Sequence, residues 1–301
     1  MKVAVTGGSG FVGTRLVQGL VDGGHTVHVL VRNVEHALSK LPPGVTGAVF
    51  RAGEPLGPEA LAGAEAVVHL AGEPVNQRWT HEGKRRIHES RVQGTRALVE
   101  AMRAAGTVRR FVSVSAVGYY GGTRSAEPKT EESPPGEDFL ASVCRDWEAE
   151  ASRAREAGIS TAVVRMGAVL HPEGGALHAM LPPFRMGAGG RVGSGKQYVS
   201  WIHREDALAG LRLLVENPAL EGSFNLSSPE PVTNTEFAHA LGTALGRPSV
   251  MHVPGFVLKA ALGEMSMMVL EGQRVVPRRL LEAGFTFQFP RLEEALKNLL
   301  A

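Results

Sequence analysis

The glycine-rich turn near the start of the chain carries the most specific chemistry in the sequence. Residues 2–13 read KVAVTGGSGFVG, which fits G-x-G-x-x-G and also T-G-x-x-G-x-x-G through Thr6, Gly7, Gly8, Gly10 and Gly13. Glycines at these spacings keep Cβ atoms away from the backbone N–H groups of a helix N-terminus, so a pyrophosphate can approach them. The pattern predicts a dinucleotide site; a glycine-rich surface loop is the alternative.

The flanking residues place this turn between a strand and a helix. Val3 and Val5 are β-branched, and apolar residues from Phe11 to Val21 recur at helical spacing. Phe11 and Val12 would then open the helix, at the end where backbone N–H groups meet the phosphates. A strand before the turn and a helix after it make a weak motif considerably more specific.

The residue after the next strand bears on which cofactor binds. A strand expected over 25–31 ends at Arg32, nineteen positions after Gly13. An acidic residue near this position usually accepts the ribose 2′-OH of NAD, whereas arginine suits the 2′-phosphate of NADP. Arg32 therefore predicts NADP(H). Two alternatives stay open: Arg32 is simply a solvated side chain, or Glu35 accepts from the ribose.

Composition excludes several classes of function. The 301 residues carry a net charge of only +2, and no Lys/Arg block with interleaved aromatic residues suggests nucleic-acid binding. No apolar run reaches the length of a membrane span, and the first strand leaves no signal peptide, so we expect a cytoplasmic protein without membrane contact. The lone Cys144 fits a reducing compartment, and no His/Cys spacing predicts a metal site.

Strands and helices alternate along the chain. Further strands are expected over 45–50, 66–70, 110–115, 160–166 and 223–226, with helices over about 80–105, 137–157 and 205–216. This order predicts a Rossmann-type, doubly wound parallel sheet with ligands beyond the carboxyl ends of its strands.

The remaining segments predict a second, smaller lobe. Residues 170–197 are rich in Gly and Pro and suggest a loop-rich substrate lid, and the last fifty residues suggest a separate small lobe. We expect a nucleotide-binding domain over 1–170, to which 203–228 returns. A substrate lobe and C-terminal subdomain would comprise 171–202 and 229–301.

Several motifs together resemble a known family. The turn, VVHLAG at 67–72, SVSAVGYYG at 113–121 and VSWIHREDAL at 199–208 stand in the order found in extended short-chain dehydrogenases/reductases, close to the sugar-nucleotide epimerases. GEPVNQRW at 72–79 and the C-terminal lobe are similar to a poorly characterised, NADP-dependent "epimerase family" subgroup. The resemblance implies further cofactor contacts from Leu70, Ala71, Gly72 and Ser113.

The chain departs from this family at its catalytic dyad. Such enzymes use a serine, matched here by Ser115, and a Tyr-x-x-x-Lys motif on the following helix. Registering that helix on Glu148 puts Leu140 and Cys144 at the two positions, and no Tyr-x-x-x-Lys exists anywhere in the chain. Tyr119, four residues after Ser115, is the best-placed phenol to act instead. The alternative is that Tyr119 packs against the cofactor or substrate without transferring a proton. Cys144 on an amphipathic helix is expected to pack in the core.

Residues after the fourth strand are candidates for substrate binding. The group consists of Glu73, Arg78, Trp79 and Arg91, joined by Lys84. Cations beside an aromatic ring suit an anionic substrate such as a sugar nucleotide. Arg91-Val-Gln-Gly-Thr95 resembles the family's N-V-x-G-T run, with arginine in place of asparagine. His203 and Asp206 match a segment that usually holds structure around the substrate loop.

A second glycine motif does not predict a nucleotide site. Residues 190–196 fit the P-loop pattern G-x-x-x-x-G-K, but Gln197 stands where Ser or Thr would bind Mg²⁺. A strand-like run follows where the P-loop requires a helix.

Two functions from different classes are compatible with the sequence. The first is an NADP(H)-dependent oxidoreductase or epimerase acting on a small polar substrate, with sugar nucleotides as one such class. The alternative is a non-catalytic NADP(H)-binding sensor or scaffold that has lost the dyad. Either could be a monomer or a homodimer. The helices over 80–105 and 137–157 often form the dimer contact in this family, but their many charged residues permit a monomer.

Overall fold

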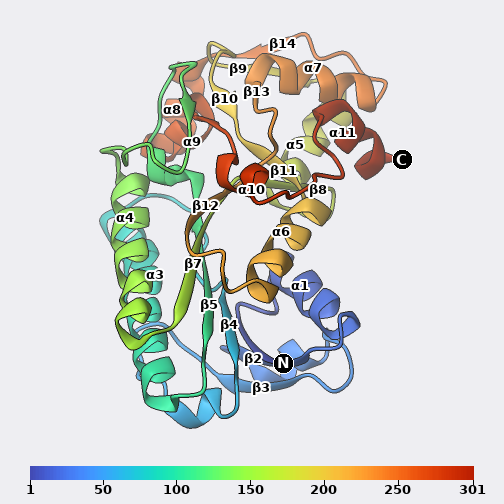
Figure 1. Cartoon of the computed structure of the whole chain (residues 1–301). Coiled ribbons are helices and arrows are strands. Elements are labelled where there is room, and N and C mark those ends of the chain that lie inside the picture. Colours follow the sequence, from blue (N-terminus) through green and yellow to red (C-terminus); the bar gives the residue numbers. More distant parts are fainter.

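The computed structural model describes residues 1–301 and contains one large parallel sheet (Figure 1). Its seven strands lie in the order β12-β7-β5-β4-β1-β2-β3. Their bounds are β1 Lys2–Thr6, β2 Thr26–Val31, β3 Thr46–Val49, β4 Ala66–His69, β5 Arg110–Ala116, β7 Ser160–Met166 and β12 Gly222–Leu226. The expected strands and the doubly wound Rossmann-type sheet are confirmed.

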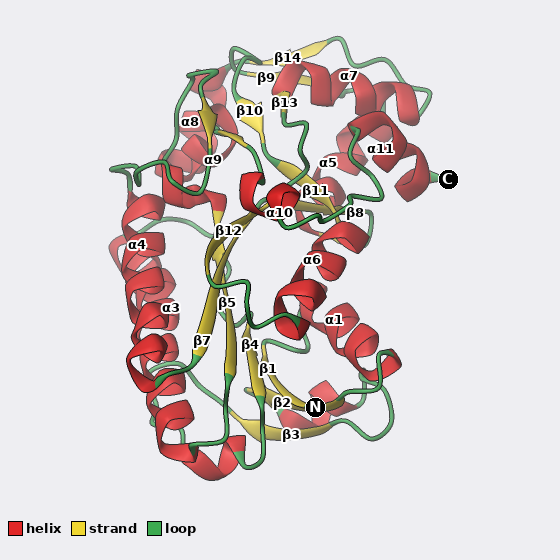
Figure 2. Ribbon diagram, in the orientation of Figure 1, coloured by secondary structure: helices red, strands yellow, loops and turns green.

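Helices cover both faces of this sheet (Figure 2). They are α1 Phe11–Asp22, α2 Val34–Leu38, α3 His81–Ala105, α4 Phe139–Ser152 and α6 Arg204–Glu216. Side chains of a strand alternate between the faces, so Val3 and Val5 pack with residues of α1 and α6, whereas Ala4 packs with residues of α3. Two apolar cores, one on each face, therefore hold the strands in place.

A second group of elements lies beyond the carboxyl ends of the large sheet. Its core surrounds Trp201 and combines α5 Gly175–Arg185, α7 Asn234–Ala244 and α11 Leu292–Leu300. Thr233 and Glu236 form a capping box at the start of α7. Four short ladders complete this part: β6 Pro128–Lys129 with β15 Arg274–Val275, β8 Ala168–His171 with β11 Trp201–His203, β9 Gly190–Val192 with β14 Met251–Val253, and β10 Tyr198–Val199 with β13 Val232–Thr233.

The segment expected to be a loop-rich lid is instead largely structured. Residues 170–197 include α5, which contains Pro182 and Pro183 in its interior. Leu177, Leu181 and Phe184 lie on one side of this helix and are buried in the core around Trp201. Burial of these three side chains outweighs the loss of backbone hydrogen bonds at the prolines, so proline content alone gave a wrong prediction here.

The last fifty residues are distributed over more than one part of the molecule. Besides α11 they contain α8 Gly255–Leu262, the 3₁₀ turn η4 Gly263–Ser266, α9 Met267–Leu270 and α10 Arg278–Glu282. Leu280 and Phe287 join the core of α1 and α6 under the large sheet. Part of this segment therefore stabilises the nucleotide-binding sheet directly and is not a separate lobe.

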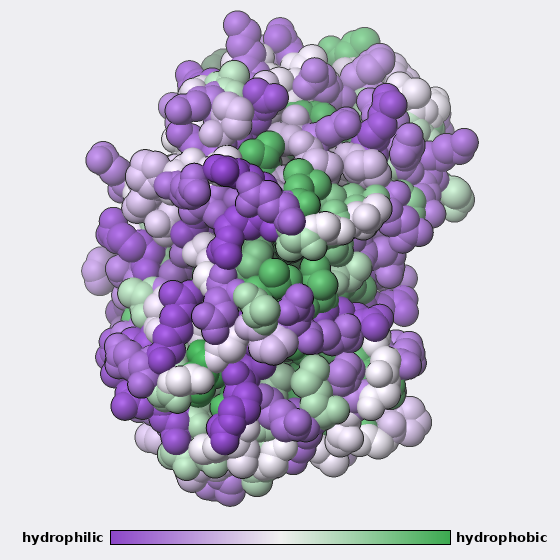
Figure 3. Space-filling view, viewed as in Figure 1, coloured by the Kyte–Doolittle hydropathy of each residue, from purple (hydrophilic) through white to green (hydrophobic).

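Hydrophilic residues cover most of the molecular face in Figure 3, and apolar residues gather near its middle. No helix has both the length and the apolar character needed to cross a bilayer.

Two glycines of α1 give opposite predictions for stability. A Cβ on Gly13 would overlap the carbonyl oxygen of Gly7, whereas a Cβ on Gly19 would meet nothing closer than Arg212 Cδ at 3.7 Å. We expect Gly13→Ala to lower the free energy of unfolding by about 1–3 kcal/mol through overpacking. Gly19→Ala should raise it by about 0.5–1 kcal/mol because alanine favours the helix. Urea denaturation of both variants measures this; equal effects would contradict the tight packing at Gly13.

Candidate functional site

The glycine turn leaves an open set of backbone donors at the start of α1. Gly10 is the N-cap, and no side chain caps this helix, in contrast to α3 and α4, which Thr80 and Asp138 cap. The N–H groups of the first α1 turn, at Phe11, Val12 and Gly13, have no acceptor in the protein. Unpaired N–H groups at the positive end of a helix dipole are suited to bind an anion.

Close packing holds the turn against the end of β4. Gly7 has φ +68°, and a Cβ there would lie 2.9 Å from Ala71 N and 3.0 Å from the Leu70 carbonyl carbon. Gly10 is exposed, and a Cβ on it would meet only the Gly7 carbonyl oxygen, at 3.2 Å. Gly7 is therefore fixed by protein packing, whereas Gly10 borders the open side of the turn.

Thr6 and His69 join β1 to β4 directly below the turn. Thr6 Oγ1 accepts hydrogen bonds from Leu70 N and Ala71 N, both at 3.1 Å, and lies 2.6 Å from His69 Nδ1. Because its two lone pairs are used, the Thr6 hydroxyl donates to Nδ1, and His69 Nε2–H donates to Thr95 Oγ1 at 3.0 Å. Burial, followed by the charge of Arg91, lowers the pKa of His69 to about 3.

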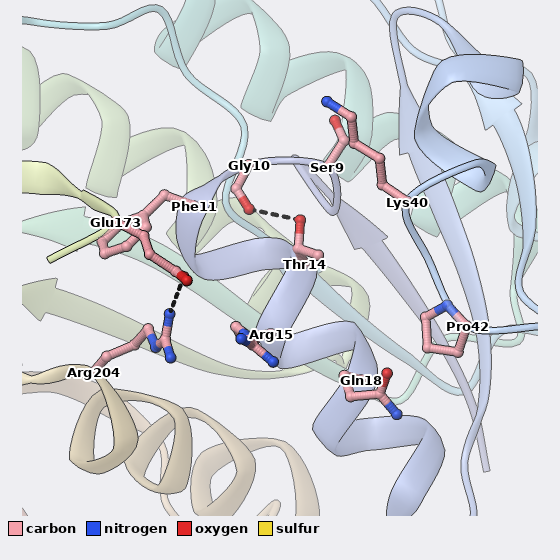
Figure 4. Close-up of a pocket in the computed structure, with 10 residues that line it drawn as sticks. All are labelled: Ser9, Gly10, Phe11, Thr14, Arg15, Gln18, Lys40, Pro42, Glu173 and Arg204. Atoms are coloured by element: carbon pink, nitrogen blue, oxygen red, sulfur yellow. Dashed lines mark hydrogen bonds and ion pairs between the residues drawn. The ribbon is translucent and has the colours of Figure 1, made fainter. Parts of the chain in front are cut away.

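A cavity of about 510 Å³ lies against the turn and the exposed side of α1 (Figure 4). Its lining includes Ser9 and Gly10 of the turn and three cations, Arg15, Lys40 and Arg204. Arg204 Nη1 pairs with Glu173 at 3.4 Å, whereas Arg15 and Lys40 have no acidic partner. The cavity extends the anion-binding character of the turn but does not reach Ser115.

Arg32 is exposed in the bend between β2 and α2 and has no hydrogen bond or ion pair within the protein. The next residue, Asn33, caps α2 by accepting from His36 N at 3.0 Å. Glu35, the alternative ribose acceptor, is exposed in the first turn of that helix. The free guanidinium of Arg32 thus stands at the carboxyl end of β2, one strand away from the turn.

Ser115 belongs to a buried polar network at the carboxyl ends of β5 and β7. It pairs in register with Arg165 of β7, and its hydroxyl donates to Glu148 Oε1 of α4 at 2.8 Å. Arg165 binds the same carboxylate with Nε at 3.0 Å and Nη2 at 2.9 Å. Both charged side chains are buried, so each depends on the other for its solvation. The proton of the Ser115 hydroxyl is therefore engaged within the protein.

The two tyrosines after β5 have different environments. Both lie in the 3₁₀ turn η2 Val117–Tyr120. Tyr120 is buried, accepts from Arg165 Nη1 at 3.0 Å and donates to Asn225 Oδ1 at 2.7 Å. Burial raises its pKa to about 12. The ring of Tyr119 lies 3.4 Å from Arg165 Cζ, and its hydroxyl has no partner in the protein. Of these two tyrosines, only Tyr119 keeps a phenol without a partner in the protein.

The two positions registered on the missing dyad face the same place. A Cβ on Gly118 would lie 3.5 Å from Leu140 Cβ and 3.9 Å from Cys144 Sγ. Leu140 packs with the cluster of Trp79, Ile87 and Val143. Cys144 is buried, and burial raises the pKa of its thiol to about 12, with the charge of Glu148 acting in the same direction. A thiol with this pKa is a poor nucleophile near neutral pH.

The candidate substrate residues do not all lie together. Trp79 is buried against Phe139, with ring centroids 5.2 Å apart, and its indole N–H donates to Val75 O. Arg78 is exposed and without a partner, and Glu73 uses its backbone carbonyl to accept from Arg91 Nη1 at 2.9 Å. Among Glu73, Arg78, Trp79 and Arg91, only the guanidinium of Arg91 lies against the Leu70–Gly72 segment. A Cβ on Gly72 would lie 3.1 Å from Arg91 Cζ.

His203 and Asp206 connect α6 to the C-terminal segment. Asp206 accepts from Gln288 N at 2.7 Å and Phe289 N at 2.9 Å, and the ring of His203 stacks on Phe289 at 4.0 Å. Burial raises the pKa of Asp206 and lowers that of His203. Gln197 of the rejected P-loop pattern donates to Val192 O and Val269 O, and strand β10 follows it.

Sequence reasoning missed the partners that hold the site together. Glu148 and Arg165 were not predicted to pair, nor were Thr6, His69 and Thr95 predicted to form one chain of hydrogen bonds. The available signal was a charged or polar side chain within an otherwise apolar strand, as at Arg165 and His69. Such a residue needs a partner when the strand is buried.

The parallel sheet, its strand order and the glycine turn beside its central strand define an α/β protein of the Rossmann class. The chain belongs to the NAD dependent epimerase/dehydratase family, whose sequence model matches residues 3–227. A further model, described as a domain of unknown function (DUF1731), matches residues 253–299.

Relatives match over the whole chain. A chloroplastic homologue of epimerase family protein SDR39U1 from Arabidopsis thaliana is 41% identical over 303 residues, covering 100% of this chain and 87% of the relative. Epimerase family protein YfhF of Bacillus subtilis is 36% identical, covering 100% of this chain and 98% of its own. The crystal structure of human SDR39U1 (isoform 2) with NADPH superimposes with a TM-score of 0.85 at 35% identity, covering 100% and 99% of the two chains.

The buried imidazole of His69 predicts a specific pH dependence of stability. Its pKa is about 3 in the folded protein, against 6.5 for a free histidine side chain, so below about pH 6.5 the unfolded chain binds a proton that the folded chain does not. Stability should be independent of this group above pH 6.5 and fall as the pH decreases, by about 1.4 kcal/mol per unit well below pH 6.5. Denaturation of wild type and His69→Gln between about pH 7 and 4 measures the difference. Glutamine keeps a donor and an acceptor but does not titrate; parallel curves would contradict the assignment.

Proposed function

We propose that this protein is an NADP(H)-dependent oxidoreductase or epimerase of the extended short-chain dehydrogenase type. One observation carries the cofactor assignment: an uncapped helix N-terminus with three free N–H groups lies one strand away from an unpaired arginine. A pyrophosphate at the first site and a 2′-phosphate at the second would satisfy both sets of donors. The NADPH in the human SDR39U1 structure supports the same assignment.

The residues present fit this cofactor. Gly7 and Gly13 allow the close packing of the turn, Gly10 leaves its open side without a Cβ, and Phe11 and Val12 contribute free N–H groups. Leu70, Ala71 and Gly72 continue the site beyond β4, beside Ser113 of β5, which pairs in register with His69. Arg15 and Lys40 add positive charge at the phosphate side. When bound, the cofactor supplies or accepts a hydride at its nicotinamide ring.

Ser115 and Tyr119 are the polar groups we assign to the reacting oxygen of the substrate. Tyr119 has a free hydroxyl, so it is able to donate a proton or a hydrogen bond to that oxygen. The adjacent Arg165 guanidinium, over the ring of Tyr119, would stabilise negative charge developing there. Ser115, held by Glu148, would fix the orientation of a substrate hydroxyl through its lone pairs. Neither role requires the absent Tyr-x-x-x-Lys motif.

The second group of elements provides the substrate side of this proposal. We assign residues 171–202 and 229–301 to the substrate lobe and C-terminal subdomain, of which Leu280 and Phe287 pack under the nucleotide-binding sheet. The proposed substrate is a small polar compound, such as a sugar nucleotide. Arg78 is an exposed cation suitable for an anionic group of such a compound. The single buried cysteine fits a reducing compartment, and we place the protein in the cytoplasm as part of the same proposal.

A non-catalytic NADP(H)-binding sensor or scaffold is the second candidate, and one observation favours it. The place of the dyad is occupied by Leu140 and a thiol whose pKa is raised to about 12 by burial, so no conventional acid/base pair faces Gly118. In a sensor, Ser115 and Tyr119 would only contact ligand. Turnover with any substrate separates the two functions.

Removing Arg32 should abolish the preference for NADP(H). A charge-assisted hydrogen bond to a 2′-phosphate contributes about 1.5–3 kcal/mol, so Arg32→Ala should weaken NADPH binding about 10- to 150-fold and leave NADH binding nearly unchanged. Calorimetric titration of both cofactors measures this, with Arg103→Ala, at an exposed position in the last turn of α3, as the control. Equal affinities of the wild type for the two cofactors would refute the NADP(H) assignment.

Substitutions at the reacting end should affect turnover and not cofactor affinity. Tyr119→Phe and Ser115→Ala should each depress turnover, by about 10²-fold or more for a proton donor, while sparing NADPH binding. Leu140→Ala and Cys144→Ser should change stability more than chemistry, because both side chains pack at the α4 contact. The assay is single-turnover NADPH oxidation with a panel of carbonyl compounds and sugar nucleotides. Loss of turnover in Cys144→Ser but not in Tyr119→Phe would reverse the role assignment.

A further inference from the structure

A second cavity, of about 370 Å³, lies between the C-terminal helices and the loop that follows the two tyrosines. Residues of α8, η4 and α9 line it on one side, and Arg124 of the loop after η2 completes the lining. It shares no residue with the cavity at the glycine turn. Its volume is near the lower end of the roughly 300–1,000 Å³ of ligand pockets, so it suits a compound much smaller than a dinucleotide.

Fixed contacts join the two segments that form this cavity. Thr123 and Gly272 form an antiparallel bridge, in which Thr123 N donates at 3.2 Å and Gly272 N at 3.1 Å. Next to the bridge, a Cβ on Gly122 would overlap the carboxylate of Glu271, so glycine at this position lets the segments approach closely. The cavity therefore has a built rim and is not a gap between unconnected loops.

Most polar side chains that line the cavity lack a partner in the protein. Arg124 and Lys259 are exposed cations without an ion pair, and the carboxylate of Glu271 is also unpaired, whereas Glu264 pairs with Lys84 of α3.

Ser266 is the most informative residue of this lining. Its side chain is buried, with 4% of the residue exposed, yet its hydroxyl makes no hydrogen bond within the protein. A buried hydroxyl normally has a partner, so the free hydroxyl of Ser266 at the wall of a cavity indicates a ligand.

Met267 connects the cavity to the reacting end of the proposed site. It lines the cavity and also packs on the apolar cluster to which Leu140 belongs. Leu140 in turn lies against Gly118, the residue before Tyr119. Figure 1 shows α8 and α9 beyond the end of α4 at which Leu140 lies. The cavity and Tyr119 therefore border the same apolar cluster.

We propose that this cavity binds the anionic end of the substrate, and that the substrate is a small hydroxylated compound bearing a phosphate or carboxylate group. Arg124 and Lys259 supply charge-assisted hydrogen bonds to that group. The Ser266 hydroxyl is free to donate, and Glu271 accepts from hydroxyl groups of the ligand. Two free cations against one free carboxylate favour an anion over a neutral compound. This inference rests on the proposed oxidoreductase or epimerase function and narrows its substrate class.

Titration of the NADPH complex with three hexose probes provides the test. Glucose 6-phosphate and glucuronate carry the two kinds of anionic group, and glucose carries none. Saturating NADPH keeps the probes away from the glycine turn. Calorimetry should show at least one of the anions binding about tenfold more tightly than glucose. Comparison of the phosphate with the carboxylate shows which group the cavity takes.

Variants assign this binding to the cavity. Arg124→Ala and Lys259→Ala should each weaken the anion about tenfold, the low end for a hydrogen bond to a charged group, because both cations are exposed. Ser266→Ala should weaken it about threefold and leave urea denaturation unchanged, since the hydroxyl has no protein partner to lose. Arg103→Ala, at an exposed cation of α3 far from the cavity in sequence, is the control and should change nothing.

Each other result has a definite meaning. Binding of neither anion, equal affinity for glucose, or affinities that Arg124→Ala and Lys259→Ala leave unchanged would overturn the proposal. In single-turnover assays the same two variants should raise the half-saturating substrate concentration and spare the maximal rate; an unchanged half-saturation would show that the cavity is no substrate site. If the wild type fails to bind NADPH, the NADP(H) function is wrong, and the same titrations of the free protein still decide whether Arg124 and Lys259 hold an anion.

Discussion

Thr6 has a single hydroxyl group, and three partners meet at its oxygen. It accepts from the backbone N–H groups of Leu70 and Ala71 and donates to the imidazole of His69, which continues the chain to Thr95 of α3. These contacts set the distance between the ends of β1 and β4, and the glycine turn is packed into the space that they define. The free N–H groups of α1, the segment with Gly72 and the place of Arg91 all depend on this spacing.

A second buried interaction organises the other side of the site. The Glu148–Arg165 pair connects α4 to β7 and determines what the neighbouring hydroxyl groups are able to do. Ser115 donates to the carboxylate, Tyr120 accepts from the guanidinium, and Tyr119 receives only the face of the same guanidinium. One ion pair thus commits two hydroxyl groups and leaves a third free. Removing either charged partner alone would leave a buried charge uncompensated, at a cost of about 3–5 kcal/mol.

The sequence predicts what depends on local pattern. Alternating apolar residues and the glycine spacing were sufficient for the strands, the sheet type and the turn, because each is specified within about ten neighbouring residues. The partners of Ser115 were not predictable, because they depend on the register of β5 against β7 and on the side of α4 that packs there. The helix α5 was missed for a similar reason: its prolines are visible in the sequence, whereas the core that covers Leu177, Leu181 and Phe184 is not.

The hydrogen bonds of Asp206 restrict how the two halves of the molecule are able to move. Asp206 belongs to α6, which packs on α1, and it holds the backbone of Gln288 and Phe289 just before α11. A hinge motion of the whole second half would break both hydrogen bonds and the stack of His203 on Phe289. Rearrangement around a ligand is therefore confined to segments without such anchors. Helix α8, which has no buried residue, is one of them, whereas Asn298 of α11 is hydrogen-bonded to His203 Nε2 at the start of α6.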